Sequence, residues 1–295
     1  ATTARPARRL RIGVDVGGTF TDLAMVDEAS GRISFHKVPS TPSDPSAAIE
    51  TGVRGLLAKD EAVADEVAFL GHGTTVATNM VIERKGARTG MVTTKGFRDV
   101  LEVARQTRPH LYNYAITRPE PLVPRRRRLE ISERLSAEGA VLAPLHAEEV
   151  TAAGQALLDA GVESIAVCFL HAWREPAHER AAKEALRRIA PDVYLSVSSE
   201  VLPEFREFDR FSTTVLNAFV GPRMARYLDR LLGRVRDIGI AAEPYTVHSN
   251  GGLMSVATAA HAPVRTYLSG PAAGVIEAGV VAGLAGFPDI VTFDA

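Results

Sequence analysis

Apolar residues near the start of the chain gather in short runs, each closed by turn residues or a carboxylate. These runs predict three consecutive β-strands, over residues 10–16, 23–27 and 33–38. Ser43-Asp44-Pro45 comes next and is typical of a helix start, because a capping side chain precedes a proline in the first turn. The helix that begins there has apolar residues at helical spacing, at Ile49, Val53, Leu56 and Leu57.

The rest of the chain predicts further strands and helices, and a loop without clear period over 105–124. Strands are expected at 67–70, 90–94, 164–170, 193–197, 245–248 and 289–294, with a small hairpin at 130–135 and 141–142. Helices are expected at 76–84, 97–104, 147–160, 177–189, 209–238 and from the 269–274 turn to 285. Gly221-Pro222 should break or kink the long helix. Helix–strand alternation between 147 and 197 favours a mostly parallel sheet with helices on its faces.

The composition is that of a soluble globular protein, with 46% hydrophobic and 23% charged residues among 295. This length allows one large or two ordinary domains. The net charge of −1 argues against a protein that binds nucleic acid or a membrane surface. The one marked basic cluster, Arg125–Arg128, lies among prolines and is expected to be a solvated loop.

The cysteine content and the N-terminal residues indicate the cellular compartment in which the protein is expected. Cys168, the only cysteine, lies in an apolar run, which excludes an internal disulfide and a cysteine metal site. Residues 1–9 are polar and carry arginines, so they predict a disordered arm rather than a signal peptide. No apolar run approaches the ~18 residues of a membrane-spanning helix. A cytoplasmic protein is therefore expected.

The most informative segment is the turn between the first two strands. The first strand ends at a carboxylate, two glycines allow a tight turn, and hydroxyls and a second carboxylate follow. The N–H groups of such a turn form an anion site, and a nearby carboxylate suits hydrated Mg²⁺. Nucleotide phosphate is the expected occupant, and a plain hairpin turn is the alternative. The residues concerned are Asp15, Gly17, Gly18, Thr19, Thr21 and Asp22.

A second glycine-bearing turn is expected at 71–75, where an apolar strand ends and a helix begins. Ligands bind at such strand ends in open α/β sheets, and the helix N-terminus favours an anion. His72 is either a hydrogen-bonding group for a substrate or a buried structural histidine. Asn79, one helical turn later, either holds the turn or reaches the ligand. The other residues of this turn are Gly73, Thr74 and Thr75.

Two more glycine-bearing turns follow apolar strands later in the chain. Ser249-Asn250-Gly251-Gly252 is either part of a ligand cleft or a plain strand-to-helix turn. The 269–274 segment, which includes Ser269 and Gly270, is either part of the same cleft or a capping turn whose glycines permit close helix packing. Several such turns at strand ends are what a phosphate-lined cleft requires.

Taken together, these segments closely resemble the hydantoinase A/5-oxoprolinase family. The resemblance runs in order through nearly the whole chain, and its motifs are long. The matching segments include D-V-G-G-T-F-T-D at 15–22, H-G-T-T-V-A-T-N at 72–79, E-R-K-G-A-R-T at 83–89, P-L-V-P-R at 121–125, S-S-E-V-L-P-E at 198–204, S-T-T-V-L-N-A at 212–218, S-N-G-G at 249–252 and S-G-P-A-A-G-V at 269–275.

The resemblance implies an α/β chain with the actin-like ATPase (ribonuclease H-like) fold, a mixed sheet with helices on both faces and an incomplete second half. It also implies an ATP-dependent amidohydrolase, in which ATP and Mg²⁺ serve to phosphorylate the carbonyl oxygen of a cyclic amide for ring opening. Hydantoin, a lactam and 5-oxoproline are the expected substrate types. An ATPase subunit of a ketone carboxylase, a small-metabolite kinase and a non-catalytic nucleotide-binding subunit are the alternatives.

Carried onto this chain, the family pattern assigns roles to individual residues. Asp15 would hold the metal, and the catalytic set would be Asp15, His72, Thr74 and Thr75. Nucleotide binding would fall to Gly17, Gly18, Thr19, Thr21, Asp22, Gly73, Ser269 and Gly270. Substrate contacts are expected from Asn79, Ser249, Asn250, Gly251, Gly252 and Arg105, the last within a specificity segment that also has Arg108, His110 and Tyr112.

The same resemblance bears on domains and partners. It predicts an N-terminal domain over 10–198 and the start of a second domain over 199–295. Family members continue with a second D-x-G-G-T turn after a T-F-D strand, a position that Phe293-Asp294 reaches. The second phosphate loop and the adenosine pocket are therefore expected on a further segment or another chain. A hydantoinase B-type subunit and a homo-oligomer are the expected partners.

Overall fold

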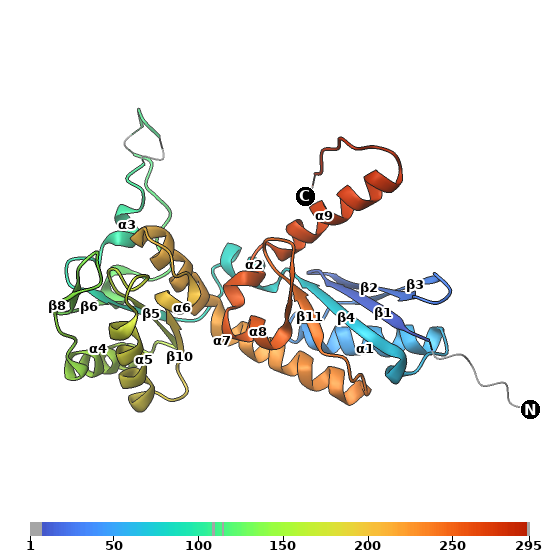
Figure 1. Ribbon diagram of the computed structural model, residues 1–295, viewed down its shortest axis with the longest axis horizontal. Coiled ribbons are helices and arrows are strands. Elements are labelled where there is room, and N and C mark those ends of the chain that lie inside the picture. The colour runs from blue at the N-terminus through green and yellow to red at the C-terminus, as the bar shows by residue number, and fades with distance from the viewer. Residues whose placement is uncertain (1–7, 108–109, 114, 294–295) are drawn as a thin grey trace, which may run out of the picture. The chain divides into compact units, whose positions relative to one another are not determined.

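The computed structural model describes residues 8–107, 110–113 and 115–293 (Figure 1). Most of the arm expected over 1–9 lies outside this part, but Arg8 and Arg9 form ion pairs with Asp27 and Glu28. The chain divides into two compact units: unit 1 comprises residues 1–83 and 223–295, and unit 2 comprises residues 84–222. The division along the sequence at 198/199 stays a prediction. Within the described part of the chain, no helix is both long and apolar enough to cross a membrane.

Unit 1 contains a six-stranded mixed sheet with the order β12-β11-β4-β1-β2-β3. The first three strands pair antiparallel, β4 and β11 extend the sheet in parallel to β1, and β12 pairs antiparallel with β11. Their bounds are β1 Leu10–Val16, β2 Phe20–Asp27, β3 Ile33–Pro39, β4 Val67–Thr74, β11 Pro244–Val247 and β12 Leu253–Ser255.

The two faces of this sheet differ in character. Alternate residues of β1 from Leu10 to Val16 are buried, whereas Arg11 and Asp15 between them are exposed. Helix α1, Pro45–Lys59, packs on the buried face, and a Cβ at its Gly52 would collide with the side chain of Leu23. The exposed face of β1 and β2 therefore presents polar side chains near the strand ends.

Unit 1 also contains short helices and the last part of a long one. The remaining elements are α2 Val76–Ile82, α8 Val256–His261, α9 Ser269–Leu284, η1 Ala64–Glu66 and η3 Pro263–Thr266. Helix α7, Glu207–Ile238, begins in unit 2 and continues through Pro222 into unit 1. Of the break or kink expected at Gly221-Pro222, the break is therefore wrong. Buried residues on both sides, Val220 and Met224 among them, keep the helix packed although proline removes one backbone hydrogen bond.

Unit 2 is built on a parallel sheet with the order β10-β9-β5-β6. Helices α4 and α5 pack on one face around Leu157 and Leu186, and α3 and the start of α7 pack on the other around Met91 and Phe211. The predicted α/β architecture with helices on both faces is confirmed for this sheet. Its elements are β5 Thr89–Thr94, α3 Val100–Val103, η2 Arg125–Arg127, β6 Arg128–Ile131, α4 Ala147–Asp159, β9 Ser164–Cys168, α5 Ala177–Ile189, β10 Tyr194–Val197 and α6 Ser198–Val201.

Two predicted strands need correction. The expected hairpin is only partly formed, because β6 joins the parallel sheet and only β7, Arg134–Leu135, pairs with β8, Val141–Ala143. The strand expected over 289–294 is not formed in residues 289–293, whose Val291 and Phe293 are 97% and 92% exposed. An apolar run becomes a strand only when a neighbouring strand pairs with it, and none in the described chain does.

Candidate functional site

A row of polar residues crosses the exposed face of the unit 1 sheet close to the ends of β1 and β4. Asp15 lies directly opposite Asp22 in the β1–β2 pair, and Asp22 lies opposite Lys37 in the β2–β3 pair. On its other side, Asp15 is paired in register with Gly73 of β4. Residues opposite one another in a sheet point to the same face, so these side chains share one surface.

The row contains two carboxylates that lie opposite one another and the ammonium group of Lys37. Two carboxylates directly opposite one another repel, which costs stability unless cations compensate for it. Lys37 is 2.9 Å from the Asp22 carboxylate and its ammonium group also lies 5.0 Å from the centre of the Phe20 ring. Lys37 thus neutralises one of the two carboxylates within the row.

The residues of the row suit a divalent cation held together with phosphate. Mg²⁺ is usually bound through one or two carboxylates, with the remaining positions taken by water and phosphate oxygens. Asp15 and Asp22 supply two such carboxylates on one surface. Within the described residues, no group of three or more His, Cys, Asp or Glu side chains is arranged to hold a metal alone. The donor set therefore fits a shared magnesium–phosphate site rather than an all-protein metal site.

The turn that follows Asp15 is held in place from β3. The Gly17 N–H donates to the carbonyl of Phe20 at 3.0 Å and so closes the turn. Ser40, just after β3, donates from its N–H to the Thr19 carbonyl at 2.9 Å and from its hydroxyl to the Gly17 carbonyl at 2.8 Å. The Thr21 and Ser40 hydroxyls share a further hydrogen bond of 3.0 Å. Thr21 therefore supports the turn from its buried side, whereas Thr19 lies at its exposed tip.

Glycine is required in this turn by close approach rather than by handedness. Neither Gly17 nor Gly18 has a positive φ, although the sequence suggested that freedom as their role. A Cβ at Gly17 would lie 3.0 Å from the Phe20 carbonyl oxygen, and one at Gly73 would lie 3.4 Å from the Asp15 Oδ1. A Cβ at Gly18 would meet nothing within 4 Å. The space beside Gly18 is thus open to a bound group.

A second group of predicted residues meets at the end of β4. The Ser269 hydroxyl donates to the Thr74 carbonyl at 3.1 Å, and a Cβ at Gly270 would lie 3.6 Å from Cγ2 of Thr75. Thr75 itself donates from its N–H and hydroxyl to the Val16 carbonyl, at 3.4 and 3.3 Å. The start of α9 therefore lies beside the junction that joins β4 to α2, next to the end of β1.

The segment 71–75 is not the turn that the sequence predicted. Gly71–Thr74 continue β4 and pair with β1 from Gly13 to Val16, so only Thr75 lies between the strand and α2. The Thr74 hydroxyl accepts from the Val76 N–H at 3.1 Å, and Asn79 donates from its amide to the Thr75 hydroxyl at 3.4 Å. Asn79 therefore holds this junction, which is one of the two roles expected for it.

His72 lies on the opposite face of the sheet from Asp15. It is fully buried, and its Nε2 is hydrogen-bonded to the Tyr227 hydroxyl of α7 at 2.5 Å. Burial lowers the pKa of His72 from 6.5 to about 4, so the ring is neutral at pH 7. The structure thus does not bring His72 together with Asp15 and presents it as a buried structural histidine. The Thr74 side chain is buried as well.

The remaining predicted substrate residues serve their own turn or belong to unit 2. Ser249–Gly252 joins β11 to β12 as a hairpin rather than leading into a helix, and Gly251 takes a φ of +85°. The Asn250 side chain accepts from the Gly252 N–H at 3.0 Å, and a Cβ at Gly251 would collide with Ile276 of α9. Arg105 belongs to unit 2, where it pairs with Asp209 at 2.6 Å. Arg108 lies outside the described residues.

Sequence reasoning missed Lys37, Ser40 and Tyr227. Lys37 and Ser40 could have been found from the sequence. The turn length fixes the register of a hairpin, and the register determines which β3 residue lies opposite each β2 residue. The predicted strands at 23–27 and 33–38 left out residues next to the turns, so they did not fix that register. Tyr227 is distant in sequence from His72, and only the tertiary fold brings it there.

Comparison with known proteins gives consistent matches. Residues 11–190 match the hydantoinase/oxoprolinase N-terminal region, and residues 210–295 match the hydantoinase/oxoprolinase family. The alpha subunit of caprolactamase from Pseudomonas jessenii is 33% identical over 294 residues, which is 97% of this chain and 42% of that protein.

Two solved structures are similar over nearly the whole chain. Nucleotide-free acetone carboxylase superposes with a TM-score of 0.86 at 26% identity, covering 95% of this chain and 41% of the other. The ATP-dependent caprolactamase from Pseudomonas jessenii superposes with a TM-score of 0.81 at 32% identity, covering 94% and 41%. The chain thus spans about two fifths of the length of these relatives.

Proposed function

The chain belongs to the hydantoinase/oxoprolinase family, and on that premise we propose that it carries the first phosphate-binding half of an ATP-dependent hydrolase for cyclic amides. The observation that carries this proposal is the Asp15–Asp22 pair beside the open turn at Gly17 and Gly18. The two solved structures reported above are both described as ATP-dependent. The fold expected for such chemistry is that of the actin-like ATPases, with the mixed sheet β3-β2-β1-β4-β11 at its centre.

In this proposal the turn receives the phosphates of ATP. The carboxylates of Asp15 and Asp22 would hold Mg²⁺, which neutralises phosphate charge when bound. The backbone at Gly18 and the hydroxyl of Thr19 approach the phosphate oxygens, since no side chain fills the space beside Gly18. Lys37 supplies a positive charge on the same surface. Phosphoryl transfer depends mainly on positioning and charge neutralisation, and these groups would supply part of both.

The start of α9 completes this side of the site. Ser269 and Gly270 lie against Thr74 and Thr75, at the same end of the sheet as the turn. The helix N-terminus carries partial positive charge and unpaired N–H groups, which favours an anion. We assign His72 a positioning role, because its contact with Tyr227 joins β4 to α7 behind the site.

The chemistry follows from the weakness of an amide as an electrophile. Transfer of the γ-phosphoryl group to the carbonyl oxygen turns that oxygen into a good leaving group. One water then adds to the carbon and the ring C–N bond breaks, with a proton going to the nitrogen, which leaves an acyl phosphate. A second water attacks the acyl carbon, and phosphate departs with the former carbonyl oxygen to leave the carboxylate. One ATP is converted to ADP and phosphate for each ring opened.

A second candidate is the ATPase subunit of a ketone carboxylase. It is favoured by the TM-score of 0.86 with acetone carboxylase, which exceeds the 0.81 found with caprolactamase. The same phosphorylation of a carbonyl oxygen would serve both reactions, and they differ in whether water or a carboxylation partner receives the activated species. Relatives are named as alpha, beta and gamma subunits, so a B-type partner subunit is part of either proposal.

The test is an ATPase assay of the complete enzyme with any partner subunit it needs. Phosphate release is measured with 5-oxoproline, caprolactam, hydantoin or acetone, the last with bicarbonate. We expect release to be stimulated by one of the cyclic amides and to be abolished by Asp15→Asn. Asp229→Asn is the matched control, because Asp229 is an exposed aspartate of unit 1 outside the row, and it should retain full turnover.

The outcomes separate the candidates. Stimulation by acetone and bicarbonate alone would favour the carboxylase subunit over the hydrolase. Near-normal turnover of Asp15→Asn with an intact circular dichroism spectrum would reject the assigned phosphate site itself. A stable phosphorylated product would instead identify a small-metabolite kinase.

A further inference from the structure

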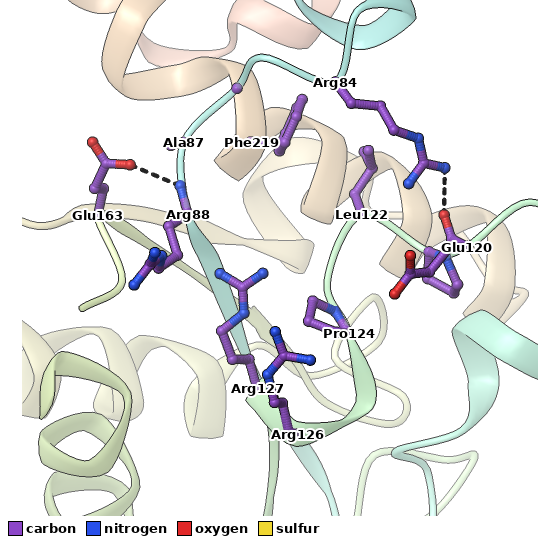
Figure 2. A pocket seen from close by; sticks show the side chains of 12 residues that line it. Arg84, Ala87, Arg88, Glu120, Leu122, Pro124, Arg126, Arg127, Glu163 and Phe219 are labelled. Atoms are coloured by element: carbon purple, nitrogen blue, oxygen red, sulfur yellow. Dashed lines mark hydrogen bonds between the residues drawn. The ribbon is translucent and has the colours of Figure 1, made fainter. Parts of the chain in front are cut away.

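Unit 2 contains a pocket of about 360 Å³ that is distinct from the residues of the proposed phosphate turn (Figure 2). Its walls come from the chain segments 84–88 and 120–127, with Glu163 and Phe219 completing the lining. Figure 2 shows Arg126 and Arg127 extending toward Arg88 from one side. All of these residues belong to unit 2, so the pocket is a feature of that unit alone.

The four consecutive arginines at 125–128 divide between the pocket and the core. Arg125 forms two hydrogen bonds with the Asp99 carboxylate, at 2.8 and 3.0 Å. Arg128 is fully buried and donates to the Val123 carbonyl at 2.8 Å. Only Arg126 and Arg127 line the pocket. The sequence-based expectation of a solvated loop is therefore wrong for Arg128, whose guanidinium group lies in the core.

Arg127 has buried donors without acceptors. Its Nε and Nη1 atoms are buried and have no hydrogen-bond partner among the described residues. Burial lowers the pKa of the Arg127 guanidinium, and the nearby charges of Arg126 and Arg88 lower it further. An arginine stays charged in proteins, so burying this charge without a partner lowers the stability of the folded chain.

The lining as a whole has an excess of positive charge. Four guanidinium groups and two carboxylates line the pocket, which gives it a net charge of +2. Within the described residues, none of the four guanidinium groups forms an ion pair with a carboxylate; the Arg84 side chain donates to the Glu120 backbone carbonyl, and Arg88 to that of Ala160. The Glu163 carboxylate accepts from the Arg88 backbone N–H at 2.8 Å.

We propose that this pocket binds the phosphate group of a small phosphorylated molecule through Arg126 and Arg127. Arg84 and Arg88 contribute further positive charge to the lining. A phosphate dianion matches the net charge of the lining and supplies acceptors for the unpaired Arg127 donors. Its three terminal oxygens can take hydrogen bonds from more than one guanidinium group at once, and its charge of nearly −2 offsets that of two arginines, whereas a single carboxylate carries only one negative charge. Leu122, Pro124 and Phe219 offer an apolar wall for the remainder of such a molecule.

The first experiment titrates inorganic phosphate into the protein by isothermal calorimetry at pH 8, with ionic strength held constant by sodium chloride. We expect saturable binding to the wild type that weakens about tenfold or more in both Arg127→Gln and Arg126→Gln. Arg126 is exposed, so its variant should fold even if the Arg127 variant does not. Arg125→Gln is the matched control, because it removes one charge from the same run but lies outside the pocket lining.

The melting temperature distinguishes a ligand-binding role of Arg127 from a structural one. Since the Arg127 donors lack partners in the folded chain, Arg127→Gln should unfold at the same or a higher temperature than the wild type without phosphate. Adding phosphate should raise the melting temperature of the wild type and of Arg125→Gln, and should raise that of the two pocket variants much less.

Three results would overturn the proposal. The first is the absence of saturable phosphate binding to the wild type, including the case in which the dicarboxylate succinate binds instead. The second is an equal loss of affinity in Arg125→Gln, which would indicate a general charge effect. The third is phosphate binding that persists unchanged in all three variants, which would show that phosphate binds outside this pocket. That last result would leave the proposed ATPase function intact.

Discussion

The buried histidine of β4 allows the sharpest test of how the site is built. We predict that His72→Gln removes a large pH dependence from the stability of the protein. Burial lowers the pKa of His72 from 6.5 to about 4, so between these values the unfolded state takes up a proton that the folded state does not. The contribution of His72 to the free energy of unfolding is therefore complete above pH 6.5 and is lost as the pH falls toward 4.

The size of this effect follows from the two pKa values. Each tenfold difference in proton affinity corresponds to about 1.4 kcal/mol, so the fall from 6.5 to about 4 amounts to about 3 kcal/mol. Solvent screening does not reduce this amount appreciably, because the ring is 0% exposed. Glutamine cannot titrate in this range but can still reach the Tyr227 hydroxyl. The variant therefore removes the effect of His72 protonation on the free energy of unfolding and keeps the hydrogen bond.

The assay is urea unfolding followed by circular dichroism, with wild type and variant compared at intervals between pH 8 and pH 4. The difference in unfolding free energy between the two should shift by about 3 kcal/mol against the wild type over this range. Carboxylates common to both proteins cancel in that difference. His146→Gln, which alters an exposed histidine, serves as the control and should run parallel to the wild type. A constant difference between wild type and His72→Gln would show that the histidine is not buried as described.

Two further predictions concern packing. Gly17→Ala should lower the unfolding free energy by about 1–3 kcal/mol, because its Cβ would lie 3.0 Å from the Phe20 carbonyl oxygen, whereas Gly18→Ala should be neutral or slightly stabilising. Equal melting temperatures for the two variants would contradict the described turn. Arg128→Met should cost about 2–3 kcal/mol in urea unfolding, since it leaves buried carbonyl groups unpaired. Arg125→Gln should change stability by less than about 1 kcal/mol because its ion pair is exposed, and a larger loss there than in Arg128→Met would refute this division of the arginine run.

Local sequence patterns were sufficient for much of the fold. The helix expected over 177–189 has the same bounds in the structure, and the strand expected at 193–197 begins one residue later at Tyr194. The helix is amphipathic, so its periodicity predicts it, and the strand that follows has a partner in β9. The 289–293 segment has an equally apolar sequence but is not a strand, because strand formation depends on a partner that local pattern cannot supply.

The candidate site was predicted less well than the fold. Its geometry depends on which face of the sheet each residue occupies and on how neighbouring strands are aligned. Glycines at 71 and 73 suggested a turn, yet pairing with β1 keeps them extended. An alternation count starting from buried Leu70 would have placed His72 and Thr74 on the buried face, away from Asp15. The Asp15–Asp22 opposition and the contribution of Ser40 needed the hairpin registers, which depend on exact strand ends. Those ends are the least reliable product of pattern analysis.

The insertion of unit 2 between β4 and β11 constrains how the protein can be synthesised. β4 leaves the ribosome early, but β11, which pairs beside it, follows only after the whole of residues 84–222. The parallel sheet of unit 2 draws its strands from one uninterrupted stretch and can assemble while translation continues. Until β11 emerges, the nascent β1–β4 sheet has an unprotected edge, the kind of surface that chaperones cover.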